Sequence, residues 1–237
     1  MSRAAGRAPQ GTVAAIIPAA GQGTRMGGGT AKQFLPLLGK PMLAHTLAAF
    51  EAATSITQVV LVVGSDLLDA CRREIVERYG FRKVHGIVPG GKERQDSVYS
   101  GLRSLGPGYD LVMVHDAARP LVTPEILDRA VAEARGKGAV VAAVPVKDTI
   151  KVVDAGAVVE TPERDRLWAA QTPQVFPYAL LLEAHQAALE DGFMGTDDAA
   201  LVERLGRPVH IVEGSPENLK ITTPEDLMLA EAILSRR

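Results

Sequence analysis

The chain has 237 residues, 46% of them hydrophobic, with a formal net charge of −2 at pH 7. This length and apolar content predict one large α/β domain with a packed core, and leave no room for a second full-size domain. The nearly balanced charge argues against bulk electrostatic binding to nucleic acid or to an anionic membrane. Any groups that bind phosphate must therefore be concentrated locally.

Cysteine content and apolar runs indicate the compartment. Cys71 is the only cysteine, so an internal disulfide is excluded, and we expect it to be a core residue of a cytoplasmic protein. No apolar run approaches the roughly 18 residues of a membrane span. Residues 1–11 lack the apolar core of a signal peptide, so we expect a flexible tail there, ahead of a single domain over residues 12–237.

The first strong pattern is an apolar run followed by a glycine-rich loop. Residues 13–17 predict a strand that is buried on both faces. The glycines of residues 21–29 let backbone N–H groups approach an anion, and Arg25 and Lys32 add positive charge. The spacing lacks the third glycine of the dinucleotide fingerprint, and no Gly-Lys pair is followed by Ser or Thr as in a Walker A loop. We therefore expect a phosphate-binding loop of another kind.

Further along the chain, apolar runs alternate with segments of helical periodicity. The expected strands are at residues 59–63, 84–88, 111–114, 139–144 and 209–212, with a last strand at 218–222. This alternation predicts a mostly parallel, twisted sheet with helices on both faces. Trp168 is expected to anchor the core, because a lone aromatic residue usually packs.

Around residue 150 the pattern changes to two β-branched runs on either side of Asp154-Ala155-Gly156, which predicts a β-hairpin. An isolated hairpin is only marginally stable in water, so we expect it to pack on something else.

Several polar residues come directly after predicted strands or interrupt them. Asp116 and Arg119 follow the run 111–114, at the carboxyl edge where α/β sheets bind ligands. Asp116 could cap a turn, hold Mg²⁺ or bind a substrate hydroxyl. Lys220 interrupts an apolar run, which is costly without an anionic partner such as a phosphate. Residues 89–97, by contrast, indicate only a turn and a helix start with exposed charges. Thr196, further along the chain, is expected to cap a helix.

Several motifs, in order, resemble those of the 2-C-methyl-D-erythritol 4-phosphate cytidylyltransferases. They include residues 18–26, Pro-Ala-Ala-Gly-Gln-Gly-Thr-Arg-Met, the Lys32-Gln33 pair, and the complete His-Asp-Ala-Ala-Arg-Pro of residues 115–120. The resemblance implies a Rossmann-like nucleotidyltransferase fold with a protruding β-hairpin arm at about residues 147–168. In the family this arm clasps the second subunit of a homodimer. Ala31 and Lys92 depart from the family pattern.

The implied enzyme transfers CMP from CTP to the polyol phosphate, giving 4-diphosphocytidyl-2-C-methyl-D-erythritol and pyrophosphate for isoprenoid precursor synthesis. The implied cofactor is Mg²⁺, held largely by CTP phosphates, with Asp116 as the one candidate protein ligand. The residues with implied catalytic roles are Arg25, Lys32, Arg164 and Lys220. The implied nucleotide contacts are Ala19, Ala20, Gly21, Gly23, Gly91, Ser97 and Ala117. The implied polyol phosphate contacts are Asp116, Arg119, Thr149, Thr172 and Thr196.

Two alternatives stay open at this point. One is a cytidylyltransferase that acts on another polyol phosphate, such as ribitol 5-phosphate. The other is a nucleotide-binding regulator without catalytic activity. The combination of Arg25, Lys32, Asp116 and Lys220 favours an enzyme, because a sensor needs no charge directed at a transition state.

Overall fold

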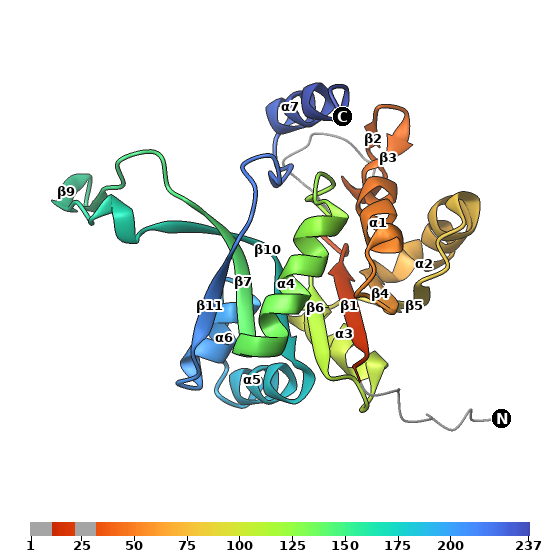
Figure 1. Ribbon diagram of the computed structural model, residues 1–237, viewed down its shortest axis with the longest axis horizontal. Coiled ribbons are helices and arrows are strands. Elements are labelled where there is room, and N and C mark those ends of the chain that lie inside the picture. Colours follow the sequence, from red (N-terminus) through yellow and green to blue (C-terminus); the bar gives the residue numbers. More distant parts are fainter. Residues whose placement is uncertain (1–10, 22–31) are drawn as a thin grey trace.

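The structure is a computed structural model that describes residues 11–21 and 32–237 (Figure 1). The predicted flexible tail lies outside these ranges except for Gly11. Gly23 and Arg25 of the predicted phosphate loop lie outside them as well, and so does the side chain of Lys32.

Within the described residues, a seven-stranded sheet forms the centre of the fold, in the order β11-β7-β10-β6-β1-β4-β5. Its strands are β1 (Val13–Pro18), β4 (Gln58–Val63), β5 (Val84–Pro89), β6 (Leu111–Val114), β7 (Ala139–Pro145), β10 (Trp168–Pro177) and β11 (Val209–Glu213). β10 runs antiparallel to its neighbours β6 and β7, and every other neighbouring pair is parallel. The predicted mostly parallel sheet is therefore confirmed.

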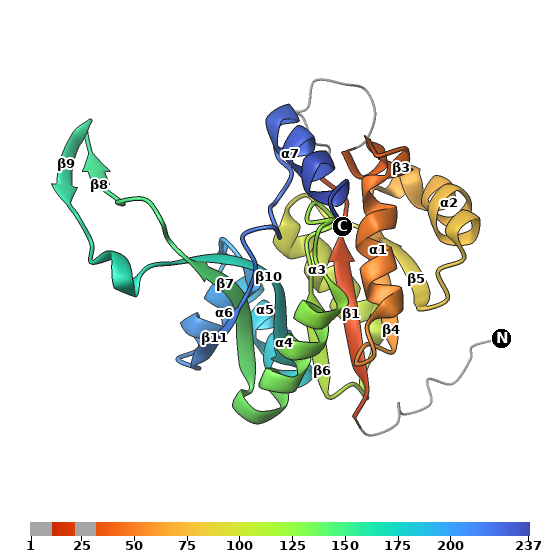
Figure 2. The same ribbon diagram turned by 45° about the horizontal axis from the view of Figure 1, so that its top comes forward.

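Helices cover both faces of the sheet, as predicted. They are α1 (Met42–Ala52), α2 (Leu68–Cys71, continuing as a π-helix over Arg72–Glu77), α3 (Arg94–Leu105), α4 (Pro124–Lys137), α5 (Tyr178–Glu190), α6 (Asp198–Arg204) and α7 (Pro224–Leu234). Alternate residues of β1 face opposite sides: Ala15 packs in the core under α1 and α4, and Ile16 in the core under α3, α5 and α6. Figure 2 shows α7 apart from both layers, beside the short hairpin of β2 (Pro36–Leu37) and β3 (Lys40–Pro41). None of the described helices has the length and apolar character needed to cross a membrane.

The predicted hairpin is present and projects from the body between β7 and β10 (Figures 1 and 2). It consists of β8 (Val152–Asp154) and β9 (Ala157–Glu160), which pair antiparallel. Ala155 and Gly156 both have positive φ angles, 47° and 83°, as a tight two-residue hairpin turn requires. The side chains of both strands are exposed. The protruding arm of the sequence prediction is therefore confirmed.

Three other expectations are wrong. Residues 218–222 form an irregular segment rather than a strand, held by the Ile221 N–H, which donates to the Ala118 carbonyl at 2.8 Å. Trp168 is 42% exposed instead of buried, because it pairs only with Pro145 at the end of β7, at the base of the arm. The N-cap of α6 is Asp197, whose carboxylate accepts from Ala200 N at 2.9 Å, and Thr196 is exposed one residue earlier.

His115 is completely buried directly after β6. Its ring contacts α1, the segment after β6 and β10. Its ring lies 5.3 Å from that of Phe50, Nε2 donates to the Arg119 carbonyl at 3.2 Å, and Nδ1 accepts from the Thr172 hydroxyl at 3.0 Å. The same hydroxyl oxygen accepts from the Asp116 N–H at 3.0 Å. These contacts are satisfied by the neutral ring, and burial lowers the pKa of His115 to about 4.

We expect Gly101 of α3 to be required for packing and Gly136 of α4 to be replaceable. A Cβ at Gly101 would lie 2.6 Å from Cγ2 of Ile16, a completely buried side chain of β1, whereas a Cβ at Gly136 meets nothing within 4 Å. Overpacking should outweigh helix propensity, so that Gly101→Ala lowers the free energy of unfolding by about 1–2 kcal/mol. Gly136→Ala should leave it unchanged or raise it by up to about 1 kcal/mol. Urea unfolding curves measure both, and equal stability of the two variants would contradict the packing argument.

We further expect His115 to make stability depend on pH. Its pKa is about 4 in the folded chain against 6.5 for the ordinary group, so the unfolded chain binds more protons between these values. Stability should therefore fall as the pH drops from about 6.5 to 4, by roughly 3 kcal/mol from this group. His115→Gln should flatten that part of the curve, and His210→Gln, at an exposed position, is the control. Parallel pH profiles of the wild type and His115→Gln would rule out His115 as the source.

Candidate active site

A cavity of about 660 Å³ opens at the carboxyl ends of β1, β5 and β6. Its wall comes from residues 18–21 after β1, Gln33 and Met42, residues 91–94 and 97 after β5, residues 116–118 after β6, and Lys220. This is the edge where a parallel sheet is expected to bind ligands. Segments that are distant in the sequence therefore meet at this edge, and Asp116 lies there as the sequence predicts.

Part of the lining consists of backbone and small side chains. It contains six of the seven predicted nucleotide contacts, Ala19, Ala20, Gly21, Gly91, Ser97 and Ala117. The Gly91 N–H donates to Ser97 Oγ at 3.2 Å. A Cβ at Gly90 would lie 2.4 Å from that of Ala20, and one at Gly91 would lie 2.3 Å from that of Asp96. Gly90 therefore lets the loop before α3 lie directly against the loop after β1, and Gly91 lets the same loop fold closely onto the first turn of α3.

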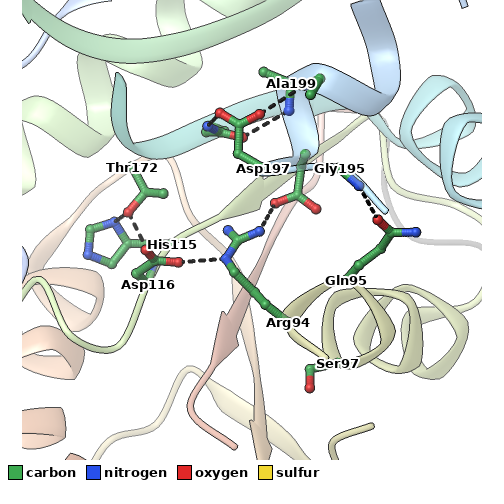
Figure 3. Close-up of polar contacts among 12 residues, drawn as sticks. Arg94, Gln95, Ser97, His115, Asp116, Thr172, Gly195, Asp197 and Ala199 are labelled. Carbon is green, nitrogen blue, oxygen red and sulfur yellow. Dashed lines mark hydrogen bonds and ion pairs between the residues drawn. The ribbon is translucent and has the colours of Figure 1, made fainter. Parts of the chain in front are cut away.

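The charged side chains of the cavity lining meet at Asp116, and Figure 3 shows its contact with Arg94. One carboxylate oxygen lies 2.9 Å from Nε of Arg94 and the other 2.7 Å from Nζ of Lys220. The guanidinium of Arg94 also contacts Asp198 through Nη1, at 2.7 Å. Burial opposes the charge on Asp116, but Arg94 and Lys220 outweigh it and hold the pKa of this carboxyl well below its usual range. Asp116 is therefore ionised, with both oxygens paired.

Arg94 was missed by the sequence prediction, which treated the charges of residues 92–96 as exposed. Glu93 and Asp96 do form a capping box at the start of α3, as the expected helix start requires. Arg94 is the first residue of that helix, where a cation is unfavourable against the helix dipole unless anions neutralise it. Burial disfavours its charge, yet Asp198 and Asp116 raise the pKa of Arg94 above its ordinary value. A cation in a first helical turn is the signal that could have indicated this site.

The predicted polyol phosphate contacts are dispersed. Arg119 donates through Nη1 to the Asn218 carbonyl at 2.7 Å, and the Thr172 hydroxyl accepts from the backbone N–H of Asp116. Neither residue lines the cavity. Thr196 is exposed beside α6. Thr149 and Arg164 belong to the arm, which Figures 1 and 2 show pointing away from the body. Of the predicted catalytic residues, the structure therefore places Lys220 at the cavity.

Two predicted catalytic residues cannot be placed by their side chains. Arg25 lies outside the described residues, as does the predicted nucleotide contact Gly23. Lys32 begins a short 3-10 helix, Lys32–Phe34, and the next residue, Gln33, is buried and lines the cavity. The position of Gln33 brings this part of the backbone to the cavity wall.

The described residues offer little to a metal ion on their own. No group of three or more His, Cys, Asp or Glu side chains among them is arranged to hold one. Asp116 and Glu93 are the carboxylates at the cavity, and each oxygen of Asp116 already has a cationic partner. A cation that enters with a triphosphate would find its oxygen ligands mainly on the phosphates. The donor set is therefore consistent with a metal carried by the nucleotide.

Comparisons with known proteins agree with this geometry. The family model described as 2-C-methyl-D-erythritol 4-phosphate cytidylyltransferase matches residues 13–236. The proteins of that name from Desulforamulus reducens and Geotalea uraniireducens are 53% and 51% identical, over 96% and 94% of this chain and 97% and 96% of their own.

Solved structures lead to the same family. A 4-diphosphocytidyl-2C-methyl-D-erythritol synthase from Anaerococcus prevotii superposes with a TM-score of 0.85 at 34% identity, covering 95% of this chain and 96% of that one. The 2-C-methyl-D-erythritol 4-phosphate cytidylyltransferase of Thermus thermophilus superposes with a TM-score of 0.76 at 35% identity, covering 94% and 98% of the two chains. The chain therefore belongs to the 2-C-methyl-D-erythritol 4-phosphate cytidylyltransferase family.

Proposed function

We propose that this protein transfers CMP from CTP to 2-C-methyl-D-erythritol 4-phosphate, giving 4-diphosphocytidyl-2-C-methyl-D-erythritol and pyrophosphate in isoprenoid precursor biosynthesis. Family membership over residues 13–236 supports the reaction. The observation in the structure that carries it is the cavity, whose lining combines small residues of two loops with the two cations that Asp116 holds. A site of this kind suits two polyanions that must be brought together.

The reaction requires positioning of the substrates and neutralisation of their charge, and it does not require a general base. The attacking group is the phosphate monoester of the polyol, whose second pKa is near 6, so it is largely dianionic at neutral pH. An oxygen of this phosphate attacks the α-phosphorus of CTP, a P–O bond forms, and the bond to pyrophosphate breaks. No proton has to be removed from the nucleophile. Rate acceleration then comes from holding the reactants in line and neutralising their charge.

Different residues bind the nucleotide and the polyol phosphate. In this proposal Gly91, Ser97 and Ala117 contact the base and ribose, and the loop of residues 19–25 holds the triphosphate. Arg25 and Lys32 neutralise the charge that grows on the α-phosphate and on the leaving pyrophosphate. Lys220, whose ammonium lies at the cavity wall, binds the attacking phosphate. A divalent cation such as Mg²⁺, bound by the triphosphate, supplies further charge neutralisation. A cytoplasmic location belongs to the same proposal.

The arm completes the site in a homodimer. Arg164 and Thr149 lie on the arm, and their proposed contacts with the polyol phosphate require the cavity of a second subunit. The apolar side chains of the arm support this arrangement, because Val153 is 56% and Val159 61% exposed in the single chain. A second chain that covers them would supply the packing that an isolated hairpin lacks.

Pyrophosphate release tests the reaction directly. We expect release from CTP with Mg²⁺ and 2-C-methyl-D-erythritol 4-phosphate, and much less with ribitol 5-phosphate or with other nucleoside triphosphates. Preferential release with ribitol 5-phosphate would move the substrate assignment to another polyol phosphate. CTP binding without release with either acceptor would overturn the enzyme proposal and support the regulator.

Mixed dimers test whether Arg164 acts on the partner's cavity. Arg25→Ala should lower kcat by about 100-fold, as for the loss of one preorganised charge donor, and Arg164→Ala should mainly raise the KM for the polyol phosphate. When both variant chains are coexpressed, each mixed dimer has two sites. In one of them the chain with Arg164→Ala supplies an intact Arg25, and the arm of the other chain supplies an intact Arg164. If association is random, activity should return to about a quarter of the wild-type level.

The readout is specific activity at limiting polyol phosphate, with each variant alone as the baseline. Coexpression of Arg25→Ala with Lys137→Ala, a surface change on α4, gives the activity expected from random pairing with an intact chain. No recovery in confirmed mixed dimers would show that Arg164 does not complete the partner's site.

A further inference from the structure

A chain of polar contacts runs from the cavity into the interior between α3, α5 and α6. Beyond Asp116, it continues from Arg94 to Asp198 at 2.7 Å and from Asp198 to Nε2 of His185 at 3.0 Å. Figure 3 shows the guanidinium of Arg94 extending from α3 toward Asp116. Asp198 is the first residue of α6 and His185 lies in the middle of α5. The helices α3, α5 and α6 are thereby connected to Asp116 at the cavity.

Burial separates the members of this chain into two groups. The side chains of Lys220 and Arg94 are 43% and 28% exposed and line the cavity, whereas those of Asp198 and His185 are 1% exposed and do not. No substrate can reach Asp198 or His185 in this arrangement. Any effect that they have on the reaction must therefore pass through Arg94.

The contacts fix the orientation of Arg94. A guanidinium is planar and rigid, so an acceptor at Nη1 and a second one at Nε leave it no freedom to rotate. Asp198 accepts from Nη1 of Arg94, and Asp116 accepts from Nε. With one oxygen of Asp116 fixed in this way, its other oxygen faces Lys220. Asp198 is thus linked to the ammonium of Lys220 through Arg94 and Asp116.

His185 holds Asp198 in turn. Its Nε2–H donates to the carboxylate oxygen that Arg94 does not use, and its ring stacks on Tyr99 of α3 with an interplanar angle of 9°. Nδ1 is buried and has no hydrogen-bond partner among the described residues. Among the described residues, the imidazole of His185 therefore has one hydrogen-bond partner, which is Asp198.

Stability alone is a weak explanation for this arrangement. Burying a carboxylate and a guanidinium carries a large desolvation cost, and apolar residues of similar size usually stabilise such a position as well or better. The ion pair of Arg94 and Asp198 instead fixes the orientation of the guanidinium. A reaction that depends on where charges are placed requires such a fixed orientation. On the basis of the function proposed above, we propose that Asp198 and His185 are positioning residues of the transfer reaction, which hold Arg94 against Asp116 and thereby place Lys220 for the attacking phosphate.

His185→Leu and His185→Gln separate positioning from folding. Leucine fills the space without donating, whereas the glutamine amide can donate to Asp198. In the full chain, His185→Leu should lower kcat/KM for the polyol phosphate by about tenfold, as for loss of a hydrogen bond to a charged group, with the KM for CTP unchanged. His185→Gln should recover most of the loss. Leu181→Ala, a buried apolar change on the same helix, should reduce stability without changing kcat/KM below the unfolding transition.

A double-mutant cycle with Lys220→Ala gives the decisive comparison. Because Lys220 is partly exposed, its truncation should leave the fold intact. If His185 acts by placing Lys220, then His185→Leu should have no further effect on kcat/KM in the Lys220→Ala background, although it still lowers the unfolding free energy. An equal fold-loss in both backgrounds, or no loss in the wild-type background, would overturn the proposal. An inactive wild type would instead contradict the proposed function.

Discussion

The structure depends most on one carboxylate that holds two cations at the edge of the sheet. Asp116 is buried at the end of β6, and its charge is tolerable there because Arg94 and Lys220 each pair with one of its oxygens. Its backbone N–H is held by Thr172 of β10, the antiparallel strand beside β6. Through these contacts the residues after β6, the start of α3, the segment before α7 and β10 are fixed relative to one another.

Much of this arrangement could be predicted from the sequence, because it rests on local patterns. Uninterrupted apolar runs identified six of the seven strands of the sheet, all except β10, and the rule that ligands bind at the carboxyl edge of a parallel sheet placed Asp116 at the ligand-binding edge. The turn residues Ala155 and Gly156 indicated the hairpin. In each case the physical cause lies within a few neighbouring residues.

The rest depends on contacts between distant residues, which no local pattern contains. Arg94 and Asp198 are separated by 104 positions, and nothing near Arg94 indicates that partner. Lys220 was expected to need an anion, and a protein carboxylate, Asp116, supplies one. The segment around it resembled a strand, but the buried amide of Asn218 holds it through hydrogen bonds to Gln171 and to the Thr172 carbonyl. Trp168 failed as a core prediction because strand β10 extends beyond the body of the protein.

The account makes a direct claim about where the two substrates lie. A crystal structure with a nonhydrolysable CTP analogue, Mg²⁺ and 2-C-methyl-D-erythritol 4-phosphate would test it. The account predicts that the polyol phosphate contacts Nζ of Lys220, that Arg94 still bridges Asp116 and Asp198, and that the arm of a second subunit brings Arg164 to the same phosphate. A polyol phosphate bound away from Lys220, with Asp116 released from Arg94, would contradict the account.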